Sequence, residues 1–246
     1  MVLVFLRAAF AALLACVTMG AQAGVVITGT RVVYPEGSRE VNVRLRNADS
    51  KPLLVQTWID DGTLNESPAK LDVPFLVTPP MSRVEPQKGQ TLRIMYTGAD
   101  LPRDRESLYF LNVLEVPPKA DAKPDDNYMQ IAVRTRLKLF LRPDGLSMPI
   151  EQAAKALTWD LADKGGIRVH NPTPYYQTMS RVQASIAGAQ VAFEQEMVAP
   201  FGTVELKRAP NKKADGAPVP AGQVRFEVIN DYGAEVQTHA ELNARR

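Results

Sequence analysis

The chain has 246 residues, of which 45% are hydrophobic, and its 29 Lys and Arg residues against 27 Asp and Glu residues give a formal net charge of +2. This length can form two domains of about 100 residues, each with its own core. The near balance of charges excludes the basic excess of a nucleic-acid-binding protein. After the first residues, no uncharged apolar run of about 18 residues predicts membrane insertion.

Residues 1–23 have the pattern of a secretory signal peptide. Arg7 precedes the apolar segment Ala8–Val17, and Ala21-Gln22-Ala23 provides small residues for cleavage after Ala23. The tetrad Leu13-Leu14-Ala15-Cys16 leaves open a lipoprotein processing site as the alternative. Cys16 is the sole cysteine, so a mature chain cleaved after Ala23 is exported without any disulfide.

Residues 24–146 read as the first of two domains and as all-β. Short β-rich segments alternate with turn-forming residues such as Pro35-Glu36-Gly37 and Asp60-Asp61-Gly62, at the spacing typical of a β-sandwich. The predicted strands are Val25–Tyr34, Glu40–Arg46, Leu53–Asp60, Phe75–Val77, Met81–Glu85, Gln90–Tyr96 and Ser107–Glu115, followed by a longer one from Asn127.

The segment from Asn127 to Pro143 alternates for longer than an ordinary strand needs. A run of about fourteen residues would extend roughly 45 Å, whereas the usual strand has about five or six residues. Part of it should therefore extend beyond its own sheet, and at an edge its apolar row would be available to a partner. A long central strand of an ordinary sandwich is the alternative. The two rows are Met129, Ile131, Val133, Thr135, Leu137, Leu139 and Leu141, and Gln130, Arg134, Arg136, Lys138 and Arg142.

Two loops and a hinge complete the organisation. Pro117–Asp126 is expected to be a solvated loop between neighbouring antiparallel strands, and Pro143-Asp144-Gly145 a short hinge. Residues 147–246 then form a second, shorter sandwich in which Pro210–Gly222 is a surface loop. Its predicted strands are Ala156–Leu161, Gly166–His170, Thr178–Ile186, Ala189–Phe193, Gly202–Leu206, Gln223–Ile229 and Gln237–Leu242.

The sequence lacks the motifs that would predict catalysis, a metal or a cofactor. It has no G-x-S-x-G turn, no G-x-G-x-x-G and no phosphate-binding loop. His170 and His239 have no ligand spacing, which favours strand or surface positions over metal binding. The doublets Asp60-Asp61 and Asp125-Asp126 adjoin turns, where Asp bonds the local backbone rather than acting as paired acids. We therefore expect no enzyme, although a hydrolase built from separate loops is a distant alternative.

Six stretches, in order, resemble the periplasmic chaperones of the chaperone-usher pilus pathway. One such stretch arises easily by chance, whereas six in register over about 200 residues are specific. They are Gly29–Pro35, Val77–Pro86, Asp104–Phe110, Thr135–Pro143, Asn171–Tyr176 and Ile229–Gly233.

The resemblance implies two immunoglobulin-like β-sandwich domains, set at an angle with a cleft between them, in a protein of the periplasm that needs no cofactor. Such a chaperone lends a strand to a pilus (pilin) subunit that lacks its own last strand, and then delivers it to an outer-membrane usher. Here the lending strand is Asn127–Arg136, with Met129, Ile131 and Val133 filling the subunit's groove. An exposed lending strand also makes self-capped dimers a possible free state.

The resemblance also assigns roles to charged residues. Arg31 and Lys138 are expected to bind the subunit's terminal carboxylate deep in the cleft. Glu106, Arg142 and Asp231 occupy the family's interdomain ionic positions, where they set the angle between the domains more than they stabilise the fold. The loop before the lending strand has about ten residues and no flanking cysteine pair, so it resembles the short-loop type.

A secreted immunoglobulin-like adhesion or carbohydrate-binding module is the alternative from another functional class. Such a module would present exposed aromatic platforms. The chain has only two tryptophans, Trp58 and Trp159, and both lie in strand-like segments suited to cores.

Overall fold

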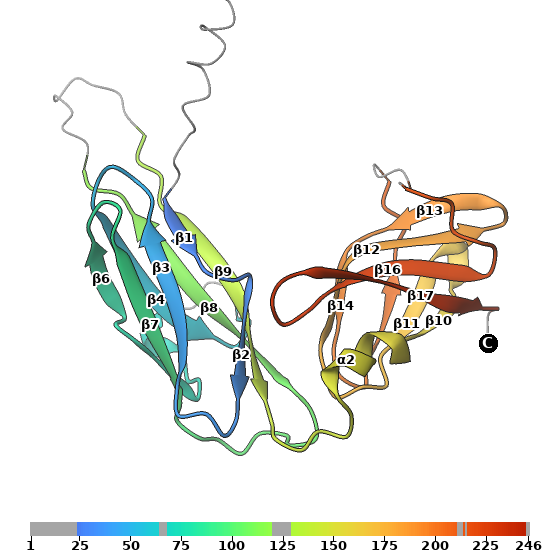
Figure 1. Ribbon diagram of the computed structural model, residues 1–246, viewed down its shortest axis with the longest axis horizontal. Coiled ribbons are helices and arrows are strands. Elements are labelled where there is room, and N and C mark those ends of the chain that lie inside the picture. The colour runs from blue at the N-terminus through green and yellow to red at the C-terminus, as the bar shows by residue number, and fades with distance from the viewer. Residues whose placement is uncertain (1–23, 64–67, 120–128, 211–213, 215, 245–246) are drawn as a thin grey trace, which may run out of the picture.

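The computed structural model describes residues 24–63, 68–119, 129–210, 214 and 216–244. The predicted signal peptide, the lipoprotein alternative at Cys16, Asp125-Asp126 and the first two residues of the predicted lending strand lie outside these residues. The described chain forms two β domains, drawn at the left and right of Figure 1.

The first domain is a sandwich of two sheets. Alternate side chains of each strand point inward, and Tyr34, Leu92, Leu111 and Leu139 are fully buried in its core. One sheet has the order β1 (Val25–Ile27), β3 (Val41–Asn47), β7 (Gly89–Tyr96) and β5 (Phe75–Thr78). The other has β2 (Arg31–Pro35), β9 (Val133–Arg142), β8 (Ser107–Val116), β4 (Leu53–Asp60) and β6 (Met81–Val84), and a single 3-10 turn, η1, spans Pro68–Lys70.

The first predicted strand, Val25–Tyr34, is divided between the two sheets. β1 pairs antiparallel with β3, whereas β2 pairs parallel with β9. Between them Gly29 has a φ of +91°, a backbone conformation that side chains with a Cβ rarely adopt. The chain crosses from one sheet to the other at this point, so β2 covers only the second half of the β9 edge.

The long predicted strand is shorter than expected at its start. β9 begins at Val133, which pairs with Glu115 near the end of β8, and Met129–Ala132 are not in a strand. The physical reason is that β8 ends at Val116, so the residues before Val133 have no neighbouring strand in the free protein. The prediction that this segment extends beyond its own sheet is consistent with this arrangement.

The second domain surrounds a second core that contains Trp159, Met179 and Phe226. Seven of its strands follow the hydrogen-bonded order β13-β12-β16-β17-β10-β11-β15, and an eighth, β14, pairs with β12 outside this order. The parallel pair of β10 and β17 joins its antiparallel halves. The strands are β10 (Thr158–Leu161), β11 (Ile167–His170), β12 (Gln177–Ile186), β13 (Ala189–Phe193), β14 (Glu196–Val198), β15 (Thr203–Leu206), β16 (Gln223–Ile229) and β17 (Glu235–Asn243).

Three short features of the second domain were absent from the sequence prediction. They are the helix α2 (Ile150–Ala153) with its 3-10 continuation η2 (Ala154–Ala156), the 3-10 turn η3 (Asp163–Gly165) and strand β14. Each of these helices, turns and strands has three or four residues, which is too short for a periodic pattern to identify. The helix α2 matters for the site, because it lies where the chain enters the second domain (Figure 1).

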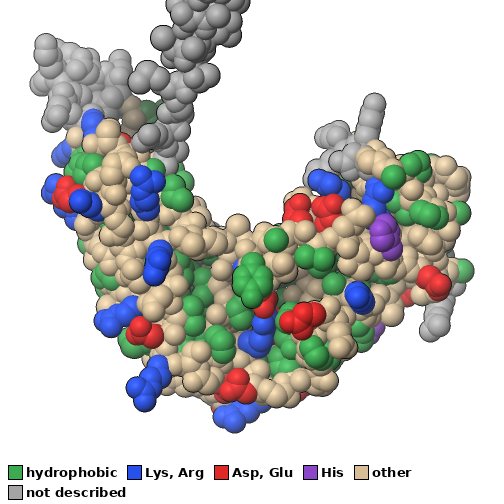
Figure 2. All heavy atoms as spheres, in the orientation of Figure 1, with side chains coloured by type: hydrophobic (Ala, Val, Ile, Leu, Met, Phe, Trp, Pro, Cys, Tyr) green, Lys and Arg blue, Asp and Glu red, His purple; other side chains and the backbone are tan. Residues whose placement is uncertain are grey.

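The two domains are set at an angle. Residues 143–149 connect β9 to α2, and the turn between β16 and β17 extends toward the first domain (Figure 1). The space-filling view shows a concave side between the domains (Figure 2). Among the residues that the structure describes, no helix is long and apolar enough to cross a membrane.

Candidate functional site

Arg31 and Lys138 lie side by side on the wall of the first domain that faces the cleft. They are Cα partners in the parallel pair of β2 and β9. Because Leu137 and Leu139 point into the core, the alternation of the strand turns Lys138 outward, and its register partner Arg31 lies on the same face. The register thus places two cations that are 107 positions apart in sequence next to each other.

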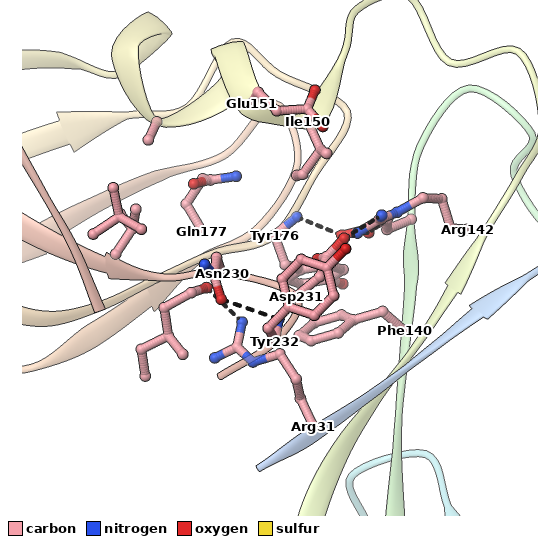
Figure 3. A pocket seen from close by; sticks show the side chains of 15 residues that line it. Arg31, Phe140, Arg142, Ile150, Glu151, Tyr176, Gln177, Asn230, Asp231 and Tyr232 are labelled. Carbon is pink, nitrogen blue, oxygen red and sulfur yellow. Dashed lines mark hydrogen bonds and ion pairs between the residues drawn. The ribbon is translucent and has the colours of Figure 1, made fainter. Parts of the chain in front are cut away.

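Both cations reach across to the second domain. Arg31 Nη1 donates a hydrogen bond of 2.7 Å to the carbonyl oxygen of Ile229, and Lys138 Nζ donates one of 3.0 Å to Thr178 Oγ1. The guanidinium of Arg31 points from β2 toward the turn after β16 (Figure 3). Its Nε is buried and has no acceptor among the described residues. These contacts are to neutral oxygens, and no acidic side chain of the described residues forms an ion pair with either cation.

The electrostatic setting of this pair favours an anion. Burial lowers the pKa of the Lys138 ammonium below its ordinary 10.5, Arg31 lowers it further, and Glu196 opposes both effects. Burial also lowers the pKa of the Arg31 guanidinium, which Asp231 and Glu106 partly offset. A desolvated pair of like charges is stabilised by a bound carboxylate, because the carboxylate satisfies free donors and relieves their repulsion.

Glu106, Arg142 and Asp231 form an ionic network between the domains. Arg142 Nε and Nη2 both lie 2.8 Å from Glu106 Oε1, while Nη1 and Nη2 bind the two oxygens of Asp231 at 2.6 and 2.9 Å. Glu106 Oε2 accepts a further hydrogen bond of 2.8 Å from the backbone of Tyr176. Asp231 and Tyr176 belong to the second domain, so this network bridges the hinge from the cleft side.

Burial and pairing oppose each other in this network. Burial raises the pKa of the Glu106 carboxyl, which is 3% exposed, although Arg142 acts to lower it. Burial lowers the pKa of Arg142, but the hydrogen bonds and charges of Asp231 and Glu106 outweigh that effect and raise it. Glu106 therefore depends on Arg142 to remain charged inside the protein.

We expect Arg142→Ala to destabilise the protein strongly, because it leaves the buried Glu106 carboxylate without a cation. Removing one partner of a buried ion pair costs about 3 to 5 kcal/mol. The matched control is Arg103→Ala, whose guanidinium is 84% exposed and 3.9 Å from Glu36, and which should change stability by less than about 1 kcal/mol. Thermal and urea unfolding of both variants measure the difference, and equal stabilities would contradict a structural role for the network.

The edge of β9 above these cations is open. β2 pairs with β9 only from Lys138 to Arg142, and no described strand pairs with residues 133–137 on that side. The apolar row that leads to this edge is exposed, with Met129 at 84%, Ile131 at 64% and Val133 at 48%. Unpaired backbone groups and exposed apolar side chains thus occur together at one strand edge, an arrangement that natural proteins normally cover.

Sequence reasoning missed a second cluster higher on the same wall. Asp60, which is 1% exposed, accepts hydrogen bonds from Arg136, from Asn112 Nδ2 at 2.7 Å and from Gly62 N at 2.8 Å, and Arg134 Nη2 lies 3.4 Å away. The turn interpretation of Asp60-Asp61 is confirmed by the Gly62 and Thr63 contacts, but Asp60 is also the anion of this cluster. The sequence feature that could have indicated this cluster is the pair of Arg134 and Arg136, which lie in the same row of β9 as Lys138.

The tryptophan interpretation was wrong for one of the two residues. Trp159 is fully buried, as expected. Trp58 is half-buried on the cleft-facing side of the first domain, with the Arg134 guanidinium 4.9 Å from its ring centroid. An aromatic ring on a strand can cover an arginine on the outer face of a sheet as well as fill a core, and alternation alone does not distinguish the two.

The histidines lie on strands apart from the cleft wall. His170 is half-buried on β11, with its Nδ1 3.0 Å from Thr203 Oγ1, and His239 is exposed on β17. Among the described residues, no three His, Cys, Asp or Glu side chains are grouped so that they could hold a metal ion.

The fold and the site together define a class of protein. Two β domains meet at a cleft, and one wall carries an open strand edge next to two cations that have no ion pair among the described residues. These are features of binding by strand addition. The family model described as "Pili and flagellar-assembly chaperone, PapD N-terminal domain" matches residues 24–147, and "Pili assembly chaperone PapD, C-terminal domain" matches residues 152–240. The chain belongs to this PapD-like family of periplasmic pilus-assembly chaperones. It is a fimbrial chaperone of the chaperone-usher pathway and not an enzyme.

Three known proteins illustrate the similarity. Chaperone protein FimB/FhaD of Bordetella pertussis is 44% identical over 236 residues, which cover 94% of this chain and 93% of that protein. The crystal structure of the CupB2 chaperone of Pseudomonas aeruginosa is 41% identical, with a TM-score of 0.74 over 89% of this chain and all of that one. The SafB chaperone of Salmonella enterica, solved in complex with the SafA pilin, matches at 30% identity and a TM-score of 0.72, covering 91% and 99%.

Proposed function

We propose that this chaperone captures a pilus subunit by adding the segment around Met129–Val133 to the subunit's incomplete sheet, while Arg31 and Lys138 bind the subunit's terminal carboxylate. The observation that carries the proposal is the open edge of β9 directly above the Arg31–Lys138 pair. A strand that pairs with this edge satisfies backbone groups that are otherwise unpaired, and it ends where the two cations lie.

The direction of the subunit strand follows from this geometry. β2 occupies the lower half of the β9 edge and runs parallel to β9, with Arg31 as its first residue. A subunit strand along residues 133–137 of β9 ends with its carboxylate at Arg31, so it also runs parallel to β9. It then continues the line of β2, and its side chains alternate in register with Met129, Ile131 and Val133.

The remaining parts of the proposal concern partners and location. The similar SafB chaperone forms a complex with a pilin, which supports pilus subunits as the partners of this chain. The subunit passes to an outer-membrane usher and leaves when another subunit's extension replaces the lent strand. The connection between β8 and β9, from 117 to 132, has no cysteine and supports the short-loop type. Export follows cleavage after Ala23, and the exposed row of Met129, Ile131 and Val133 would allow two free chaperones to cap one another as a dimer.

The experiment is co-expression in the periplasm with a candidate pilin that lacks a donated strand. The chaperone should co-purify with the pilin in a one-to-one complex and prevent its aggregation and proteolysis. A pilin completed by its own fused donor strand is the control, because its groove is already filled. Equal capture of the open and completed pilins would contradict strand addition.

A further inference from the structure

A hollow of about 310 Å³ lies between the domains on the Arg31 side of the cleft (Figure 3). It is bounded by β2 and β9 of the first domain and by α2 and the β16–β17 hairpin of the second. This volume is at the lower limit for ligand sites, so it suits a single large side chain better than a cofactor. Its apolar lining residues are Phe140, Ile150, Ala154, Val228, Tyr232 and Val236.

The charges around the hollow distinguish its possible occupants. Glu106, Arg142 and Asp231 are paired with one another, which leaves Arg31 and Glu151 as lining charges without an ion pair among the described residues. The buried Nε of Arg31 also has no acceptor there. A group with an anionic end next to Arg31 and an apolar body complements this wall, whereas an acidic side chain would face Glu151 and a basic one Arg31.

Tyr232 gives the hollow an uncovered aromatic rim. Its side chain is 93% exposed, and the nearby Val236 is 44% exposed. The turn that carries Tyr232 is nevertheless held in place, because Asn230 Oδ1 accepts hydrogen bonds from the backbone of Tyr232 at 3.0 Å and of Ala234 at 2.9 Å. A well-held turn that leaves an aromatic ring uncovered is typical of a binding surface.

The turn is also fixed against the strand that carries Arg31. Gly233 has a φ of +83°, and a Cβ at this position would lie 2.5 Å from Thr30 Oγ1, so only glycine allows this approach. The Arg31 guanidinium then contacts the carbonyl of Ile229 at the start of the same turn. The cation and the apolar hollow are thus parts of one rigid arrangement.

We propose that this hollow receives the side chain of the subunit's last residue and selects large apolar residues at that position. This inference rests on the proposed function, in which Arg31 holds the terminal carboxylate. The carboxylate and the side chain of a terminal residue share one Cα, so a residue held by Arg31 places its side chain at the hollow that Arg31 lines. Tyr232 and Val236 then cover the side chain from the hairpin.

The test measures the binding of synthetic peptides with the sequence of a subunit's last strand to the mature chaperone. Peptides that end in Leu or Phe should bind roughly 10-fold to 100-fold more tightly than a peptide that ends in Gly, and those that end in Asp or Lys should bind no more tightly than Gly. Each peptide is also made as a terminal amide, which reports on the carboxylate separately.

Two variants test whether the preference for large apolar terminal residues arises in this hollow. Tyr232→Ala removes the rim, and Ala154→Trp fills the interior. Both should reduce the Leu-to-Gly ratio several-fold and leave the difference between acid and amide peptides unchanged. The control is Leu76→Ala, another exposed apolar residue, on β5 in the sheet that does not contain β9. Because Tyr232 is almost fully exposed, its variant should fold even if Ala154→Trp does not.

The outcomes separate this inference from the proposed function. Acid-dependent binding with equal affinity for Leu, Phe and Gly peptides would overturn the terminal side-chain pocket and leave the carboxylate anchor intact. A Leu preference that Tyr232→Ala leaves unchanged would also overturn it. Equal binding of acid and amide peptides would contradict the anchor itself, and with it the basis of the inference.

Discussion

Replacing Arg31 or Lys138 with alanine is expected to reduce subunit capture by at least about 30-fold, the largest effect of any single substitution in the cleft. Each cation supplies a partly buried, charge-assisted contact to the terminal carboxylate, and removal of one partner of such a contact costs about 2 to 5 kcal/mol. Co-purification with a periplasmic pilin and peptide affinity both measure the loss. Subunit capture that is unchanged in both variants would contradict the anchor.

The control variants are Arg44→Ala and Arg93→Ala, which remove exposed cations from β3 and β7 in the sheet that does not contain β9. They should capture subunits like the wild type. Arg31→Ala and Lys138→Ala should also unfold at temperatures close to that of the wild type, because each loses one hydrogen bond across the cleft and one desolvated charge. A loss of capture in folded protein therefore reports on binding.

Titration of Lys138 gives the anchor a further signature. In the free protein its pKa is lowered below 10.5, mainly by burial, and a bound carboxylate favours the ammonium and raises the pKa again. The complex then binds more protons than the free protein in the window between these two pKa values. Peptide affinity should be constant below the free pKa and fall as the pH rises through it, whereas Lys138→Arg should weaken this dependence.

The second large effect is expected at the apolar row. Ile131→Asp should reduce subunit capture by at least about 100-fold, because it removes an apolar side chain from the subunit's groove and places an unpaired carboxylate there. The whole row of Met129, Ile131 and Val133 contributes roughly 5 to 8 kcal/mol gross before the costs of association. Because Ile131 is 64% exposed in the free chaperone, its folding should change little.

The matched control is Ala132→Asp, which adds the same charge one residue later. In a paired strand its side chain points to the opposite face from Ile131, so it should remain outside the groove. The ratio of the two effects tests the alternation directly. Equal losses of subunit capture in both variants would indicate a general charge effect at this edge. They would contradict the assignment of Met129, Ile131 and Val133 to the groove.

The anchor and the row must act together. Because the side-chain period of a strand is two, a shift of one residue would turn all three apolar side chains out of the groove. Lys138 is five positions after Val133 on β9, and Arg31 is its partner in register. The position of the bound carboxylate therefore determines which face of the lent segment enters the subunit. The binding free energy from the apolar row thus depends on the Arg31–Lys138 pair.

Alternation was sufficient to predict most strands but could not divide them between sheets. The Val25–Tyr34 pattern is continuous in sequence, yet the chain changes sheets near Gly29, a decision that depends on tertiary packing. Likewise, the alternating pattern already begins at Asn127, several residues before Val133, where β9 starts to pair with β8. The residues before Val133 have the sequence of a strand and lack a partner in the free protein.

The candidate site was predictable only where a family motif covered it. The resemblance identified Arg31, Lys138 and the Glu106–Arg142–Asp231 positions, whereas spacing alone left each as an ordinary strand charge. The hollow was not predictable, since its lining comes from β9, α2 and the β16–β17 turn, which are distant in sequence. The Asp60 cluster similarly requires the pairing of β4, β8 and β9.

Amide hydrogen exchange of residues 129–137, in the free chaperone and in its complex with a pilin, tests strand addition most directly. The edge amides of this segment that have no partner in the free protein should become protected by at least about 100-fold in the complex, and protection at 138–142 should change little because β2 already pairs there. Complex formation without new protection in 129–137, or with protection confined to the second domain, would contradict the account.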